Sequence, residues 1–207
     1  MQQPLAKLLK IPDRKPQGPL PTFEKAHLLL AFLTIAENEP IGRHALATRA
    51  DLGEGAVRTV LKRLSEGGLA ESDASGCHLT PTGREVRSSL AKKLSPIVTV
   101  EGGSLTVGAV QVAVAIRGGG DAVKTGIEQR DYAIAAGAAG ATTFIMKGPC
   151  FTMPGGSEDC EQDFPSRAWE RLRSQLRPHD GDAVILCGSN SEKSARLGAL
   201  SAALNLL

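Results

Sequence analysis

The chain has 207 residues, long enough for two small domains, and its 42% hydrophobic and 22% charged content is typical of a globular protein. Aromatic residues make up only 3%, which argues against a platform that stacks single-stranded bases. Residues 1–95 carry 14 Lys and Arg against 10 Asp and Glu, whereas residues 96–207 carry 10 against 12. A basic first part and an acidic second part fit a module that faces a polyanion joined to one that does not.

Cysteines, histidines and apolar runs give no sign of export, membrane insertion or metal chemistry. No two of the four cysteines form a C-x-x-C pair, so we interpret them as reduced thiols of a cytoplasmic protein. The N-terminal residues lack an apolar run of signal length, and we expect no membrane segment. The four histidines have no spacing that builds a metal site or a nucleophile–base pair. We therefore predict no metal, no cofactor and no catalytic residue.

The first part of the chain begins with an arm and three helices. Four prolines fall between positions 12 and 21, and they predict an extended basic arm over residues 1–21. Apolar residues at helical spacing predict a helix over 22–38, with Thr22 as its cap. A short second helix is expected over 42–50, and a third begins at Gly53 after a turn of about three residues.

The third helix has one apolar and one mostly basic face. Val57, Val60 and Leu64 recur at helical spacing, and the glycines at 67 and 68 end the helix. Two short strands follow, over 69–72 and 77–80, and then a fourth helix over 81–94. Three helices, a hairpin and a helix predict a winged helix-turn-helix domain over 22–95.

In such a domain the third helix enters the major groove, while the second lies across the phosphate backbone. Arg58 is our candidate for reading guanine, because its planar fork matches two acceptors of that base. Thr59 lies beside it, and Lys62 and Arg63 are expected to hold phosphates or base edges. Glu54 would repel phosphate unless it accepts from cytosine or only caps the helix. The remaining candidates are expected to contact the DNA backbone: Arg43, Thr48 and Arg49 on the second helix, and Ser75 and His78 on the wing.

A motif runs from the third helix into the wing and the fourth helix. Its residues are Leu64, Gly68, Leu69, Leu79, Thr80 and Gly83. In this pattern the chain resembles the winged-helix domains of archaeal and bacterial transcription regulators, in which a recognition helix leads into L-x-x-x-G-L, a wing and L-T-x-x-G. The resemblance implies a regulator that binds double-stranded DNA. Winged helices also serve as protein-docking modules, and that alternative stays open.

From residue 96 the composition changes, and Val- and Gly-rich stretches alternate with helical patterns. Strands and helices in alternation predict a layered α/β domain, with a sheet on one side and helices packed on it. The fold class expected for the whole chain is therefore α+β. The expected elements are strands within 97–117, a helix over 127–138, strands over 141–147 and 150–153, an acidic loop over 154–163, a helix over 164–176, a strand over 182–188 and a helix over 191–207.

Two stretches of the second domain are candidates for binding a small anionic effector. Both lie where a loop opens a helix, so free backbone N–H groups are expected there. At the second stretch, Ser189 and Glu192 are also spaced as a capping box, which would satisfy those donors internally. Arg130 could clamp an anion, or it could pair with a neighbouring carboxylate. The candidates are Gly126, Glu128, Gln129, Arg130 and Asp131 in the first stretch, and Ser189, Asn190 and Ser191 in the second.

The second domain resembles the uncharacterised α/β domain attached to winged helices in small archaeal regulators. This resemblance implies a sensor or dimerisation domain and therefore a homodimer, but no chemistry. Small residues on the last helix offer a surface for close approach, either to a second copy or to the domain's own sheet: Ala195, Gly198, Ala199, Ala202 and Ala203. A bifunctional enzyme, with a second domain acting on a nucleotide or phosphorylated metabolite, is the alternative.

Overall fold

The computed structural model describes residues 8, 25–101 and 103–207, and the chain forms two compact units, Met1–Ala91 and Lys92–Leu207. The boundary precedes the expected one at residue 95, because Ser95 belongs to the second unit: its N–H donates to the Ala115 carbonyl at 2.9 Å. Of the predicted arm, only Leu8 falls within the described residues, and it is helical and buried. The expected cap at Thr22 also lies outside them. In the described ranges, no helix is long and apolar enough to cross a membrane.

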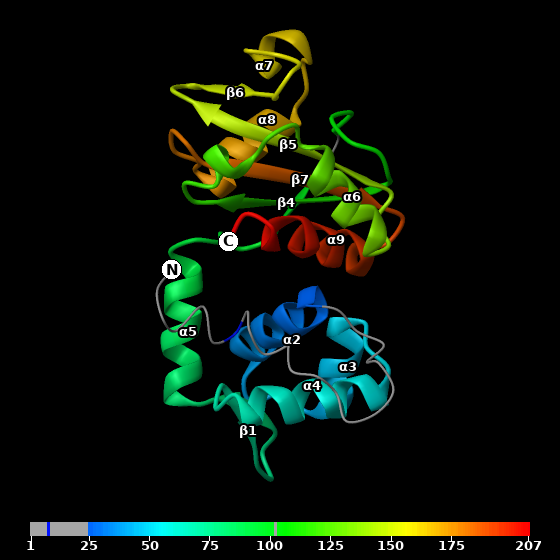
Figure 1. The fold of residues 1–207 in the computed structure, drawn as a ribbon. Coiled ribbons are helices and arrows are strands. Elements are labelled where there is room, and N and C mark those ends of the chain that lie inside the picture. The colour runs from blue at the N-terminus through cyan, green and yellow to red at the C-terminus, as the bar shows by residue number, and fades with distance from the viewer. Residues whose placement is uncertain (1–7, 9–24, 102) are drawn as a thin grey trace. The chain divides into compact units, whose positions relative to one another are not determined.

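Residues 25–91 of the first unit form three helices, a two-stranded hairpin and a further helix, in the predicted order (Figure 1). Helix α2 is buried along its whole middle, residues 28–35, as expected of a central core helix. It contacts α3, α4 and α5. The elements are α2 (Lys25–Asn38), α3 (Arg43–Ala50), α4 (Glu54–Glu66), β1 (Ala70–Ser72), β2 (Cys77–Leu79) and α5 (Pro81–Ala91).

The motif that joins wing and fourth helix has a structural explanation. The Thr80 hydroxyl donates to the Gly68 carbonyl at 2.7 Å and accepts from the Gly83 N–H at 3.0 Å, so it ties the start of α5 to the entry of the wing. A Cβ at Gly83 would lie 2.0 Å from the Leu69 carbonyl oxygen. Glycine is therefore required at this position because α5 crosses the backbone before β1 without room for a side chain.

The second unit is built on a five-stranded sheet of order β3-β4-β7-β5-β6, in which every pair is antiparallel. This agrees with the α+β class. The strands are β3 (Val98–Val100), β4 (Val110–Ile116), β5 (Gly140–Lys147), β6 (Cys150–Thr152) and β7 (Ala183–Ser189); the helices are α6 (Ile127–Ala135), α7 (Cys160–Asp163), α8 (Ala168–Arg171) and α9 (Glu192–Leu204), with short turns η2 (Gly120–Ala122) and η3 (Leu172–Leu176).

Helices cover both faces of this sheet, whereas the sequence predicted helices on one side. Helices α6 and α9 pack on one face, and α8 with the π-helical turn η3 packs on the other (Figure 1). The predicted acidic loop over 154–163 also ends in a short helix, α7, which Asp159 caps by accepting from the N–H groups of Glu161 and Gln162. Alternation of elements along a chain does not specify the face on which each helix packs, and the one-sided arrangement predicted from it was wrong.

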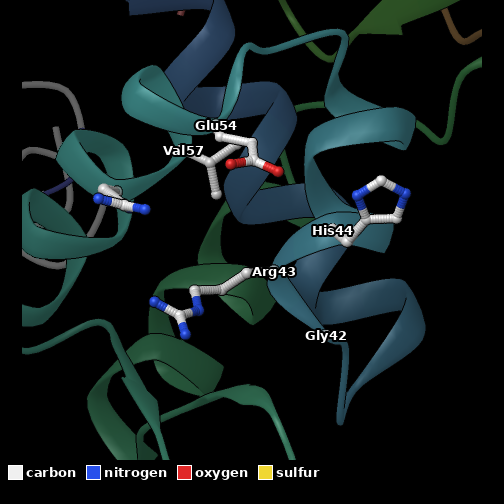
Figure 2. Close-up of a pocket in the computed structure, with 6 residues that line it drawn as sticks. Gly42, Arg43, His44, Glu54 and Val57 are labelled. Atoms are coloured by element: carbon white, nitrogen blue, oxygen red, sulfur yellow. The ribbon is translucent and has the colours of Figure 1, made fainter.

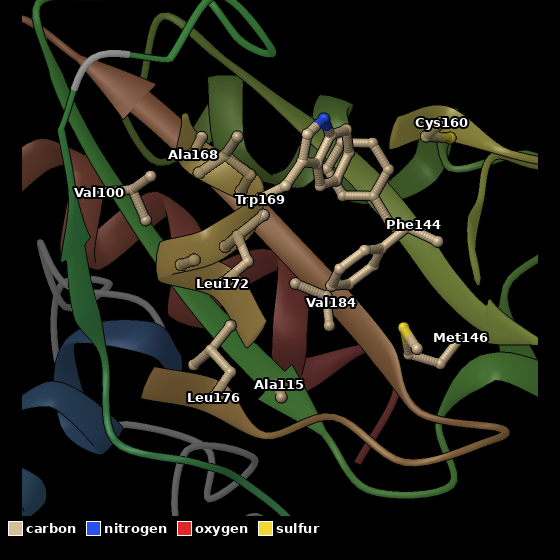
Figure 3. Close-up of a cluster of buried hydrophobic side chains, with 13 residues drawn as sticks. Val100, Ala115, Phe144, Met146, Cys160, Ala168, Trp169, Leu172, Leu176 and Val184 are labelled. Carbon is tan, nitrogen blue, oxygen red and sulfur yellow. The ribbon is translucent and has the colours of Figure 1, made fainter. Parts of the chain in front are cut away.

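The core beneath α8 is aromatic. Trp169 packs edge-on against Phe144, with ring centroids 4.9 Å apart (Figure 3). The Trp169 ring centroid also lies 5.1 Å from that of Phe151. Its indole N–H donates to the Phe164 carbonyl at 2.9 Å, so the buried ring keeps its hydrogen bond. Three of the few aromatic residues thus hold one face of the sheet together.

A buried carboxylate, Asp182, joins the residue before β7 to the residues that follow β4. Asp182 has a side chain only 5% exposed, and it accepts from the Arg117 guanidinium at 2.7 Å and from the N–H groups of Gly118 and His179 at 2.9 and 2.8 Å. Burial alone would raise the pKa of this carboxyl. The hydrogen bonds and the Arg117 charge outweigh burial and lower the pKa below its ordinary 3.8.

Because the folded-state pKa of Asp182 is depressed, its contribution to the free energy of unfolding is present above pH 3.8 and is lost as the pH falls through the folded value. We expect Asp182→Asn to lower the stability of the second unit by about 2 kcal/mol at pH 7 and to flatten its acid dependence. Urea denaturation at pH 7 and pH 3 measures both effects. Asp121→Asn, at an exposed position, is the control, and an equal loss in both variants would contradict the assignment.

Candidate nucleic-acid interface

Helices α3 and α4 are joined by a tight three-residue turn. Asp51 ends α3 in the left-handed conformation, with φ of 55°, and this is a conformation that aspartate tolerates better than most residues. Leu52 is buried and its N–H donates to the Ala47 carbonyl at 3.0 Å. Gly53 then caps α4. The turn fixes the two helices as the helix-turn-helix that the spacing predicted.

Helix α4 buries its apolar face and exposes its basic one. Val57, Val60 and Leu64 are buried, and Arg58 and Lys62 are exposed one turn apart. Lys62 lies 3.9 Å from Glu66, a long contact between exposed side chains that contributes little stability. The Lys62 ammonium therefore stays available to another anion.

The other predicted residues of these helices differ in their setting. Thr59 is exposed, and its hydroxyl donates to the Gly55 carbonyl one turn earlier at 3.1 Å. Thr48 makes the same kind of bond to the His44 carbonyl at 3.1 Å. Arg43 and Arg49 are exposed on α3, whereas Arg63 is half-buried on the flank of α4. Arg63 is therefore the least accessible of the predicted basic residues.

A pocket of about 420 Å³ opens between the first turns of α3 and α4. Arg43 and His44 project from α3, and Glu54 and Val57 from α4 (Figure 2). Arg58 completes the lining together with Gly42. The structure thus brings together Arg43 and Arg58, which lie 15 residues apart in sequence. His44 was not predicted as a site residue; its place one residue after Arg43, at the helix start, was the available signal.

Three glycines around this pocket are not required by the fold. A Cβ at Gly42, Gly53 or Gly55 would meet nothing within 4 Å, and the two caps have ordinary φ values of −70° and −64°. Glycine caps also leave the first N–H groups of both helices without a side-chain acceptor, at the end where the helix dipole is positive. The start of α3 has no acidic residue in its first turn and therefore offers backbone N–H groups to an anion, whereas Glu54 in the first turn of α4 would repel one.

The wing differs from the sequence-based expectation. The Ser75 hydroxyl and N–H donate to Asp73 at 2.6 and 2.7 Å, and these bonds lower the pKa of that carboxyl. His78 is half-buried, with Nε2 3.2 Å from Glu71 and Nδ1 3.9 Å from Asp73. Two carboxylates thus surround the residues expected to contact phosphate. The hairpin itself is as predicted, but Ser75 and His78 are poorly placed for this role.

The two effector stretches of the second unit do not form one site. Gly126 lies against Thr143 of β5, which pairs with Ile185 of β7, whereas Ser189 ends β7 four residues further on. Four strand residues span about 13 Å. The sequence placed both at helix starts, but it held no information about their separation.

Side chains within these stretches are also largely engaged. Arg130 pairs with Asp131 at 3.1 Å on the surface, Glu128 accepts from the Thr125 hydroxyl at 3.0 Å, and Gln129 is buried. The Glu128 pKa is lowered, first by its own N–H and then by this hydroxyl. Ser191 caps α9 by accepting from the Ser194 N–H at 3.2 Å, so the predicted cap at Ser189 was wrong; Ser189 is buried in β7, and Asn190 between them is exposed.

The expected dimer surface on the last helix is covered by its own unit. Ala195, Gly198, Ala199, Ala202 and Ala203 are all buried. A Cβ at Gly198 would lie 2.6 Å from the Ala138 side chain, 2.9 Å from the Cys187 sulfur and 3.3 Å from the Ala133 carbonyl oxygen, so the small residues let α9 lie close to β7 and α6. Of the two readings of this stripe, packing against its own sheet is the one the structure shows. In the described part of the chain, no three His, Cys, Asp or Glu side chains cluster as a metal site would require.

Comparison with known proteins gives one family match in each unit. Residues 27–85 match the family described as PH0730-like, N-terminal domain, and residues 107–206 match a domain of unknown function, DUF4443. The structure is similar to that of hypothetical protein PH0730 from Pyrococcus horikoshii OT3, with 26% identity and a TM-score of 0.67 over 87% of this chain and 91% of that chain. The chain is therefore similar over most of its length to a protein of an archaeon, whereas the regulator role that the resemblance implied stays a prediction.

A second solved structure, the activation domain of the phage T4 transcription factor MotA, aligns with 43% of this chain and 86% of its own, at 20% identity and a TM-score of 0.31. A likeness this weak supports no conclusion about function. No curated protein matches the chain.

Proposed function

We propose that the chain is a cytoplasmic transcription regulator that binds double-stranded DNA through its first unit. The observation that carries the proposal is the exposed basic face of α4, which continues across the pocket to Arg43 of α3. A helix supported by a second helix at this turn fits the width of the major groove. Lysine and arginine on such a face attract phosphates whatever the sequence.

The roles follow from the position of each side chain. Arg58 lies on the outward face of α4 near its start, where side chains of a recognition helix reach base edges, so we assign it guanine. Lys62, one turn further along, holds a phosphate. Arg43 and the N–H groups at the glycine-capped start of α3 hold phosphates beside the pocket. The wing, with its carboxylates around Ser75 and His78, is assigned no phosphate contact.

The second unit is proposed to dimerise or to sense, rather than to catalyse. An anionic effector would bind at one of the two stretches alone, because they lie about 13 Å apart along the sheet. Both stretches are partly engaged within the chain, because Ser191 caps the start of α9 and Arg130 makes an exposed pair with Asp131. Two DNA-binding units in one dimer would read two half-sites and bind far more tightly than one.

A substitution at Gly55 tests whether the start of α4 approaches DNA closely, without damage to the fold. Because nothing lies within 4 Å of an added Cβ and Gly55 is inside the first turn of α4, Gly55→Ala should stabilise the first unit by about 0.5–1 kcal/mol. The added methyl group would separate α4 from the groove, and we expect duplex affinity to fall about tenfold.

Fluorescence anisotropy with a labelled duplex measures the affinity, and thermal unfolding measures the stability. Ser88→Ala, at an exposed position of α5, is the matched control and should leave binding unchanged. If Gly55→Ala binds as tightly as the parent chain, the start of α4 does not approach DNA closely.

A further inference from the structure

Helix α6 exposes more apolar surface than its length accounts for. Of the described residues, the large hydrophobic side chains that are strongly exposed are Val107, Ile127, Tyr132, Ile134 and Phe164. Three of these five belong to α6, a helix of nine residues, and each of the three is 46–50% exposed. Single exposed apolar residues are normal, but Ile127 and Ile134 lie on one face of this short helix and indicate a surface that another element covers. Tyr132 lies about 140° around the helix axis from Ile127 and is outside that face.

The positions on α6 form a symmetric pattern. Ile127 and Ile134 are seven residues apart and therefore lie on one stripe of the helix, about 10 Å from each other along its axis. Arg130 and Asp131 are the two middle residues of this interval, and both are exposed. Reading the interval in either direction gives an isoleucine, a charged pair of opposite signs and an isoleucine.

We propose that this face of α6 binds α6 of a second copy of the chain, with the two helices antiparallel about a twofold axis that passes between Arg130 and Asp131. In an isologous contact, if residue i meets residue j, then j also meets i. Ile127 therefore meets Ile134 of the partner subunit, and Arg130 meets Asp131 of the partner subunit. Each contact occurs twice, so the face is complementary to itself in both apolar surface and charge.

Charge selects a second copy over an unrelated partner. Opposite charges stand at the centre of the face, and the antiparallel arrangement places each beside its opposite, whereas a parallel arrangement would place like charges together. The pair is 3.1 Å apart within one chain and exposed, so little stability is lost when its members turn to a partner.

The other helix on this face of the sheet does not compete for the role. Helix α9 lies beside α6 (Figure 1), and its small residues are already buried within the unit. The α6 contact does not depend on DNA binding. If the chain is a dimeric regulator, as proposed above, this is the surface through which it would dimerise.

Light scattering and sedimentation equilibrium of the full chain, over micromolar concentrations, test the contact. We expect a dimer of 21.6 kDa chains. Ile127→Glu with Ile134→Glu places carboxylates opposite each other twice and should raise the dimer dissociation constant at least about 100-fold. Phe164→Glu, at a residue 46% exposed but outside α6, is the control and should remain dimeric. Circular dichroism confirms that each variant is folded.

A second variant tests the antiparallel register. Ile127→Glu with Ile134→Lys places opposite charges across the twofold axis, so it should dimerise at least about tenfold more tightly than the variant with two glutamates. In a parallel contact the two variants would both oppose like charges. A monomeric parent chain, a dimer that tolerates both glutamates, or equal dissociation constants for the two variants would each overturn the proposal. Duplex binding is measured separately, so a monomer that binds DNA refutes the α6 contact and not the proposed function.

Discussion

Gly83→Ala is expected to lower the free energy of unfolding of the first unit by about 3 kcal/mol. The added Cβ would lie 2.0 Å from the Leu69 carbonyl oxygen and 3.0 Å from its carbon. Both are backbone atoms, so no flexible side chain can move aside, and α5 must separate from the entry of the wing. Separation would also lengthen the bonds through which Thr80 joins the two.

The measurement is amide hydrogen exchange of the first unit in the full chain. Protection of the β1–β2 hairpin and of the first turns of α5 should fall most. Gly55→Ala is the matched control, because it adds the same methyl group where nothing lies within 4 Å and should increase protection. Equal protection in Gly83→Ala and the parent chain would show that α5 can shift without cost.

Arg58→Ala and Lys62→Ala are expected to weaken DNA binding in different ways. If Arg58 makes a bidentate contact with guanine, its loss costs roughly 1–3 kcal/mol on the cognate site and flattens discrimination at one base position. If Lys62 holds a phosphate, its loss weakens binding to all sequences alike and reduces the salt slope by about one. A base contact depends on the sequence, whereas counterion release does not.

Both variants should be titrated with cognate and scrambled duplexes over a salt series. Arg63→Ala is a useful comparison, because Arg63 is half-buried on the flank of the same helix and should change binding less. Equal, sequence-independent losses for Arg58→Ala and Lys62→Ala would assign both to phosphate. Unchanged binding in both would mean that the basic face of α4 is only solvated surface.

Much of the first unit could be predicted because its signals are local. The spacing of Val57, Val60 and Leu64 alone defines which face of α4 is buried, and the glycines after it define its end. The role of Gly83 could not be predicted from its position, because the Leu69 carbonyl that excludes a side chain is 14 residues away. The proximity of Arg43 and Arg58 likewise depends on how α3 and α4 cross.

The second unit was harder to predict because its features depend on tertiary contacts. The cap at Ser189 fitted a sequence spacing, yet β7 continues through Ser189, and α9 begins at Glu192 with Ser191 as its cap. Small residues on α9 could pack against a partner or against the chain's own sheet, and the sequence does not distinguish the two possibilities. The contacts with Cys187 and Ala138 show that they pack within the unit. The exposed isoleucines of α6 have no sequence signature, because an apolar residue on a short helix is ordinarily assumed to be buried.

The central claim is that the full chain binds duplex DNA through a basic surface, and the most direct measurement is its affinity for a labelled duplex over a range of salt concentrations. We expect measurable binding at low salt, with the logarithm of the association constant falling linearly as the logarithm of the salt concentration rises, by about 0.9 for each phosphate contacted. Arg43, Arg58 and Lys62 should each contribute to the affinity. No binding at the lowest salt concentration, or binding that salt does not weaken, would contradict it.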